Sequence, residues 1–158
     1  MTFLHGIIGN KAAASYKLGG TSTVDIIYPI FSLVLLTFIV AGCVGVSRLL
    51  SVRRRQVHPK YYSLMTGDTP PAYVQKFGRN FENLLEMPVL FYALGALAIV
   101  LKINDANLVS QAWLFVLLRF AHTAIHITYN NSLHRLIVFA LSMLILFSMW
   151  VQLFILVT

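Results

Sequence analysis

Charged residues are scarce in this sequence, and their scarcity excludes a soluble globular protein. They make up 11% of the 158 residues, whereas hydrophobic residues make up 58%. The core of one domain of this length would not bury so many leucine, isoleucine, valine and phenylalanine side chains. The composition therefore predicts a single-domain integral membrane protein.

Cysteine and acidic residues are also scarce in the sequence. Cys43 is the only cysteine, so no internal disulfide can form, and thiol chemistry would need a thiol brought by a substrate. Only 5 acidic residues stand against 12 lysines and arginines, which gives a net charge of +7. In a soluble protein this excess would suggest nucleic acid. In a membrane protein a basic cytoplasmic loop and membrane lipid as a partner explain it, and we expect no nucleic-acid partner.

The sequence contains no internal repeat, no low-complexity segment and no recognisable secretory signal peptide. The apolar run at residues 3–8 is too short for the core of a signal peptide, and no convincing cleavage site follows it. We interpret residues 1–23 as a flexible N-terminal tail that can lie on the membrane surface. Residues 24–158 then form the transmembrane domain.

Four apolar segments predict four membrane-spanning helices. They cover residues 26–47, 87–103, 106–129 and 136–157. Each is close to the roughly 20 residues that a helix needs to cross the hydrocarbon core. The second helix is expected to begin outside the bilayer, with Thr69 as its cap, and to run past Glu86 without a break. With Ser132 as the expected cap of the last helix, the predicted fold is an all-α four-helix bundle.

Basic residues cluster in the first loop and indicate the orientation. Seven lysines and arginines lie between residues 48 and 79, against the single acidic residue Asp68. Cytoplasmic loops carry such an excess, so we expect this loop to be cytoplasmic. Four spans then place both termini on the extracytoplasmic side and bring the turn at residues 130–132 to the same side as the first loop.

A polar stripe follows the second helix into the membrane. Its members are spaced at i, i+3, i+4 and i+7 and share one helical face: Arg79, Glu82, Asn83 and Glu86. Ionisable groups at membrane depth are costly and usually face a bundle interior or a polar cavity, so we interpret the stripe as the wall of a binding site. Arg119 in the third helix reaches the depth of Glu86 and is expected to pair with it.

Arg135 lies at the same membrane face, in the first turn of the last helix, where a cation opposes the helix dipole. These residues together predict a polar pocket that opens to the cytoplasm. A purely structural role for these residues is the alternative. Arg48 and Arg135 lie at the ends of spans, where arginines extend their charged groups to the membrane surface, and the stripe can hold one structural ion pair. His122 and His126 share a helical face and could ligate a metal, but no third ligand is evident. We expect them to form hydrogen bonds within the bundle, and we expect no metal site.

The spacing of Arg79, Asn83, Glu86 and Pro88 resembles the second-helix signature of the MAPEG family, the membrane-associated proteins of eicosanoid and glutathione metabolism. This family includes the microsomal glutathione transferases. Residues 119–126 resemble its third-helix pattern. Arg48 and Arg135 match the arginines that end its first helix and open its fourth. The resemblance covers about residues 26–157.

The resemblance implies a homotrimer that binds glutathione, a co-substrate, between subunits near the cytoplasmic face. Glu86 would receive the glutamyl amine, and Arg135 would be the catalytic residue that stabilises the thiolate. The other residues that it implies for glutathione binding are Arg48, Arg79, Asn83, Arg119, His122, His126 and Tyr129.

Some residues depart from the family pattern. Members usually have Glu-Arg where this chain has Gln75 and Lys76, and some have an aromatic residue at the position of Met87. His122 and His126 stand where the leukotriene-synthesising branch has tyrosines, which argues against an eicosanoid substrate. We therefore expect a glutathione transferase or peroxidase that acts on lipophilic electrophiles or hydroperoxides. The alternatives are a small proton-coupled four-span transporter and a non-catalytic member that binds lipid or a partner.

Overall fold

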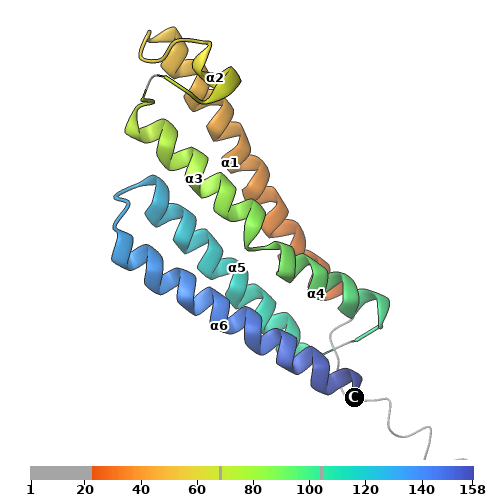
Figure 1. Ribbon diagram of the computed structural model, residues 1–158. Coiled ribbons are helices and arrows are strands. Elements are labelled where there is room, and N and C mark those ends of the chain that lie inside the picture. Colours follow the sequence, from red (N-terminus) through yellow and green to blue (C-terminus); the bar gives the residue numbers. More distant parts are fainter. Residues whose placement is uncertain (1–22, 68, 104) are drawn as a thin grey trace, which may run out of the picture.

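The computed structural model describes residues 23–67, 69–103 and 105–158, and the described residues form helices and no strands (Figure 1). The predicted N-terminal tail lies outside the described residues except for Thr23. The elements in chain order are the 3₁₀ turn η1 (Thr23–Ile26), α1 (Ile27–Arg53), α2 (Tyr61–Leu64), α3 (Ala72–Glu86), α4 (Val89–Val100), α5 (Ala106–Ile127) and α6 (Ser132–Val157). The all-α prediction is confirmed.

Four helical stretches are long and apolar enough to cross a membrane. They are Ile27–Arg53, Ala72–Val100, Ala106–Ile127 and Ser132–Val157. Large apolar side chains point outward from them, including Phe38, Phe147 and Phe154, which are each at least 69% exposed. Lipid tails, unlike water, accept such a surface, and the helices satisfy their own backbone groups. The chain is therefore an integral multi-pass membrane protein, as predicted.

The second span is broken, and the prediction that it runs without interruption is wrong. Helix α3 ends at Glu86 and α4 begins at Val89, and the axis changes direction between them (Figure 1). Pro88 has no N–H to donate, and its ring crowds the carbonyl of Leu84, so the helix cannot continue through it. The helical hydrogen bonds resume after the proline, where the N–H of Tyr92 donates to the carbonyl of Pro88 at 2.9 Å. As a result α3 packs against α1 and α5, whereas α4 packs against α1 and α6.

Two predicted helix caps are also wrong. Helix α3 follows Pro71, which is extended and makes no side-chain capping bond, so Thr69 is not the cap. Proline suits a helix start because it has no N–H that would need a partner there, and the N–H of Val74 donates to the Pro71 carbonyl at 3.0 Å. Helix α6 is capped by Asn131 rather than Ser132. The Asn131 Oδ1 accepts from the N–H groups of Leu133 and His134 at 2.9 and 3.2 Å.

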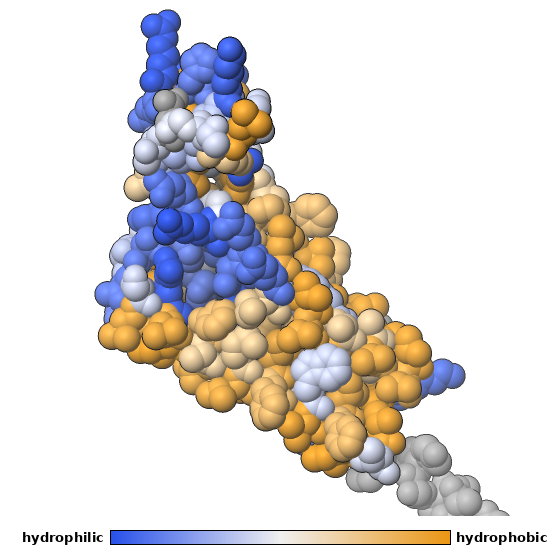
Figure 2. All heavy atoms as spheres, in the orientation of Figure 1, coloured by the Kyte–Doolittle hydropathy of each residue, from blue (hydrophilic) through white to orange (hydrophobic). Residues whose placement is uncertain are grey.

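The two ends of the bundle differ in polarity. The end of α1, α2, the start of α3 and the α5–α6 turn lie together, opposite the C-terminus (Figure 1). Figure 2 shows hydrophilic residues gathered over this region and hydrophobic residues over most of the remaining visible surface. We call it the polar end and define it as residues 53–67, 69–79 and 128–135. The first loop and the α5–α6 turn are thus on the same side, as the four-span prediction requires.

Candidate functional site

Arg119 is fully buried between α3 and α5, although it is a cation in a membrane-spanning helix. Its Nη2 donates to the Oδ1 of Asn83 and also to the backbone carbonyl of Asn83 at 3.3 Å. The carbonyl of Asn83 also accepts from the N–H of Met87 at 3.2 Å, and it lies at the negative end of the helix dipole, which favours a guanidinium. The predicted pairing with Glu86 is wrong, because the side chain of Glu86 is exposed.

Further polar side chains extend this buried contact toward the polar end. Thr123 donates to the Oδ1 of Asn80 at 3.4 Å, and Asn80 is fully buried. His122 and His126 are each 4% exposed, with ring centroids 5.8 Å apart. No group of three His, Cys, Asp or Glu side chains suited to a metal occurs among the residues described. Asn80 and Thr123 were not predicted as site residues, although Asn80 is a polar residue beside the stripe and Thr123 lies inside residues 119–126.

A cavity of about 110 Å³ opens where α3 meets the turn between α5 and α6. We call it the basic cavity. Its lining includes three cations, together with His126 and Asn130: Lys76, Arg79 and Arg135. Lys76 Nζ donates to the carbonyl of Thr128 at 2.8 Å, and Arg135 Nη1 donates to the Oδ1 of Asn130 at 2.6 Å. These bonds hold two cations at the cavity, which can therefore receive an anion.

A second cavity of about 300 Å³ lies between α1, α2 and α3. We call it the arginine cavity, because Arg48 and Arg79 both line it. The Arg48 guanidinium lies 5.6 Å from the ring centre of Tyr62, whose hydroxyl is hydrogen bonded to Ser51 at 2.7 Å. Helix α1 continues past Arg48 to Arg53, and this extension brings Ser51 opposite Tyr62. Gln75 and Arg79 line both cavities, so the two adjoin.

The predicted site residues therefore fall into three groups. Arg48, Arg79, His126 and Arg135 line the two adjoining cavities. Asn83, Arg119 and His122 lie deeper between α3 and α5. Glu86 and Tyr129 are exposed and line neither cavity, and the Tyr129 hydroxyl is hydrogen bonded to His134 at 3.0 Å.

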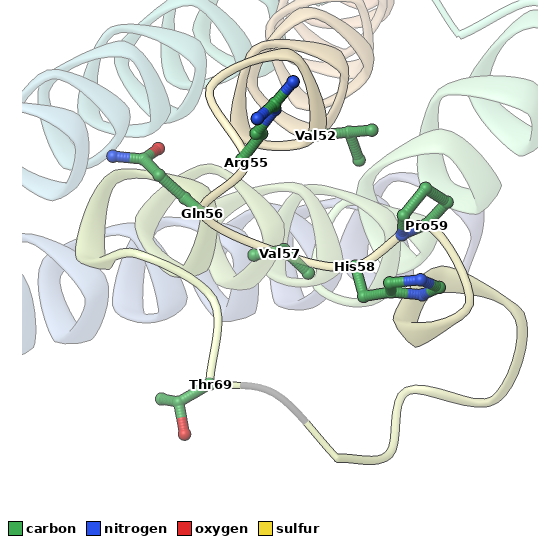
Figure 3. Close-up of a pocket in the computed structure, with 7 residues that line it drawn as sticks. All are labelled: Val52, Arg55, Gln56, Val57, His58, Pro59 and Thr69. Atoms are coloured by element: carbon green, nitrogen blue, oxygen red, sulfur yellow. The ribbon is translucent and has the colours of Figure 1, made fainter.

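A third cavity, of about 540 Å³, contains none of these residues. It lies at the polar end, between the last turn of α1 and the loop before α3. Figure 3 shows Arg55 and Gln56 on one side of it and Thr69 across the hollow. Two mainly apolar cavities of about 310 and 270 Å³ lie along α1, the first beside Cys43 and Phe77 and the second beside Phe81 and Tyr92. Their linings suit apolar molecules.

A model of the MAPEG family matches residues 26–155. The chain belongs to the MAPEG family. No curated protein and no solved structure matches it. The resemblance inferred from the helix motifs is thus confirmed, and MAPEG membership supports a role in membrane-associated glutathione or eicosanoid metabolism. Within this MAPEG chain, Gln75 and Lys76, which depart from the usual pattern, are both part of the basic cavity.

Proposed function

We propose that this protein is a membrane glutathione transferase or peroxidase that acts on lipophilic electrophiles or hydroperoxides. One observation carries the proposal: Lys76, Arg79 and Arg135 line one cavity beside the membrane-spanning part of the bundle. Glutathione is anionic, and its carboxylates and thiolate need such cations. The same cations disfavour the cationic substrate of a proton-coupled transporter.

Arg135 would favour the thiolate of bound glutathione. Its Nη1 is held by Asn130, while its Nε is buried and has no partner among the described residues. A cation beside a thiol lowers the thiol pKa from its usual value near 8.5 and so increases the reactive thiolate at neutral pH. In the transferase reaction the sulfur bonds to the electrophilic carbon, and the leaving group departs with the electrons of its broken bond.

In the peroxidase reaction the thiolate would attack the terminal oxygen of the hydroperoxide and break the O–O bond. The alcohol leaves after it takes up a proton, and a sulfenic acid forms on glutathione. A second glutathione thiolate then attacks that sulfur and displaces hydroxide, which leaves as water after protonation, and the two glutathiones end as a disulfide. Both reactions begin with the same thiolate, so a single cationic site serves them.

The second substrate would enter from the bilayer. The two apolar cavities along α1 are open at the surface of the apolar helices and suit a lipophilic molecule. A compound dissolved in the hydrocarbon would reach them by lateral diffusion.

A homotrimer would complete the site. Glu86 and Tyr129, which are exposed on the protomer, would then approach glutathione across a subunit contact. Asn83, Arg119 and His122 would support the wall from inside the bundle. We also propose that the polar end is cytoplasmic, because Arg53, Arg54 and Arg55 lie there and cytoplasmic loops carry such residues.

The test is glutathione binding to the detergent-purified protein, followed by calorimetry and by the ultraviolet absorbance of the thiolate. We expect binding with a thiolate signal that Arg135→Ala abolishes. Binding with no thiolate signal would leave a non-catalytic member, and no binding at millimolar glutathione would contradict the proposal. Efflux of a cationic drug driven by a pH gradient, without glutathione, would favour the transporter.

A further inference from the structure

An apolar groove runs along one face of α1 toward the polar end. It is the cavity of about 310 Å³ beside Cys43, and we call it the α1 groove. Phe77 of α3 forms one wall, and the α1 residues that line it recur at helical spacing: Ile39, Gly42, Cys43, Val46, Ser47 and Leu50. A Cβ atom at Gly42 would meet nothing within 4 Å, so the middle of the groove is open. The groove can therefore receive an acyl chain from the bilayer.

Two arginines continue the face of α1 on which the groove lies. Arg53 and Arg54 follow Leu50 by three and four residues, at the end of the helix. Both side chains are exposed, and within the described part of the chain neither guanidinium has a hydrogen bond or an ion pair. No acidic residue occurs between residues 26 and 67, so α1 and the segment after it supply no counter-ion. The α1 groove thus ends at two guanidinium groups that can bind an anion.

The length of α1 places these arginines at the depth of the lipid headgroups. The helix has 27 residues and spans about 40 Å, whereas the hydrocarbon core of a bilayer is about 30 Å thick. Exposed apolar side chains continue along α1 as far as Leu49 and Leu50, and exposed cations begin at Arg53. Figure 2 shows the same change from hydrophobic to hydrophilic surface toward the polar end. The surface therefore changes within one helical turn, as a phospholipid does between its acyl chains and its phosphate.

We propose that each chain binds one anionic phospholipid, with an acyl chain in the α1 groove and the phosphate at Arg53 and Arg54. The guanidinium fork matches phosphate oxygens in a bidentate manner. Anionic lipid is favoured over zwitterionic lipid, because a zwitterionic headgroup brings an ammonium that the two arginines repel. The inference is independent of glutathione. The other apolar cavity, beside Phe81 and Tyr92, is lined by no cation and stays available to the second substrate of the proposed reaction.

The experiment titrates lipid onto the full-length protein in a non-ionic detergent and counts the bound molecules by native mass spectrometry. The probes are phosphatidylglycerol and phosphatidylcholine with the same acyl chains. We expect one saturable phosphatidylglycerol per chain, bound about tenfold or more tightly than phosphatidylcholine. Arg53→Gln/Arg54→Gln should weaken phosphatidylglycerol binding about tenfold or more and phosphatidylcholine binding less than about twofold. Arg53→Lys/Arg54→Lys, which keeps the charge, should retain most of the preference, and millimolar inorganic phosphate should not displace the lipid.

Two matched variants separate a defined site from general attraction. Arg55→Gln removes the neighbouring charge, but Arg55 lies past the end of α1 and lines a different cavity, so it should change phosphatidylglycerol affinity less than about twofold. Gly42→Leu fills the α1 groove and should weaken the binding of both lipids. Gly45→Leu adds the same side chain at an exposed glycine of α1 outside the groove and should leave both affinities unchanged.

Several results would overturn the inference. Equal affinities for the two lipids, or equal losses in Arg53→Gln/Arg54→Gln and Arg55→Gln, would mean that a basic segment attracts anionic lipid without a defined site. Displacement by inorganic phosphate would indicate a phosphate site in place of a lipid site. If Gly42→Leu left lipid binding unchanged and dissociated an oligomer, the groove would be a contact between copies of the chain. None of these results bears on glutathione binding, so the proposed function is tested separately.

Discussion

Arg119 and Asn83 form a buried contact in which one guanidinium nitrogen donates to two oxygens of the same residue, the amide Oδ1 and the backbone carbonyl. The contact joins α5 to the last turn of α3, just before the break at Pro88. A buried cation is thus held by neutral oxygens at the negative end of a helix, without a carboxylate.

Removal of the Asn83 side chain should destabilise the protein. Asn83→Ala leaves the Arg119 charge buried with only the backbone carbonyl, so we expect a loss of about 2–4 kcal/mol in the free energy of unfolding. Thermal unfolding in detergent measures it. The control is Asn107→Ala, at an exposed position of α5, which should change stability by less than about 0.5 kcal/mol. Equal losses in the two variants would contradict a specific role for Asn83.

Arg135 should affect the pH dependence of the proposed reaction. A cation near a thiol lowers its pKa by about 1–3, and each unit changes the thiolate fraction about tenfold below the pKa. Arg135→Ala should therefore slow turnover about 8–30-fold near pH 7, since a thiol of pKa about 8.5 is already about 3% thiolate there. Loss of the cation raises the thiol pKa, so the deficit should be largest at low pH and should shrink as the pH rises toward about 8.5.

Arg135→Lys is the control for this pH profile, because it keeps a positive charge in the first turn of α6. It should recover part of the activity at neutral pH. A deficit in Arg135→Ala that stays the same from pH 6 to pH 9 would mean that Arg135 does not act on the thiolate.

Gly95 allows α4 to approach α1 closely. A Cβ atom at Gly95 would lie 2.4 Å from Cδ1 of Ile30, whereas a Cβ atom at Gly42 would meet nothing within 4 Å. We expect Gly95→Ala to destabilise the protein by about 1 kcal/mol or more and Gly42→Ala to stabilise it by about 0.5–1 kcal/mol, since alanine favours the helix. Ile30→Val removes the clashing atom, so the double variant Gly95→Ala/Ile30→Val should recover stability. If the double variant is no more stable than Gly95→Ala, the contact with Ile30 is not the cause of the destabilisation.

A hydrogen-bond network far from the polar end should affect stability but not binding. Gln111 donates to Gln152 at 2.7 Å, Ser148 donates to Gln111 at 3.1 Å, and Gln152 donates to Asp105 at 2.5 Å. Gln111 is about 22 Å along α5 from His126. Gln111→Leu should lower the free energy of unfolding by about 1–2 kcal/mol and leave glutathione affinity unchanged.

Ser110→Ala is the control for Gln111→Leu, because the exposed Ser110 hydroxyl donates, among the residues that the structure describes, only to the carbonyl of Ala106 in its own helix. It should change stability little. If Gln111→Leu lowered the glutathione affinity and left stability unchanged, the prediction that this network affects stability and not binding would be contradicted.

The sequence was sufficient to predict the four spans, because the length of an apolar run is a local property. It also indicated that Arg79 and Arg135 belong to one site, since topology alone brings α3 and the start of α6 to the same end. The partner of Arg119 was not predictable, because Asn83 and Glu86 share the stripe and only the rotation of α3 against α5 decides between them. Asn130 enters the basic cavity through the α5–α6 turn, which has no periodic signature, whereas Lys76 lies on α3 three residues before Arg79 and extends the stripe by one turn.

The break at Pro88 has a consequence for the surrounding lipid. Helix α4 has 12 residues, which span about 18 Å, and the hydrocarbon core of a bilayer is about 30 Å thick. In a bilayer of that thickness the last turn of α3, with Asn83, therefore lies within the hydrocarbon. This is a hydrophobic mismatch, relieved by contacts with other protein or by a locally thinner bilayer. Either way, a hydrophilic thiol and a compound dissolved in the acyl chains could meet at the same depth.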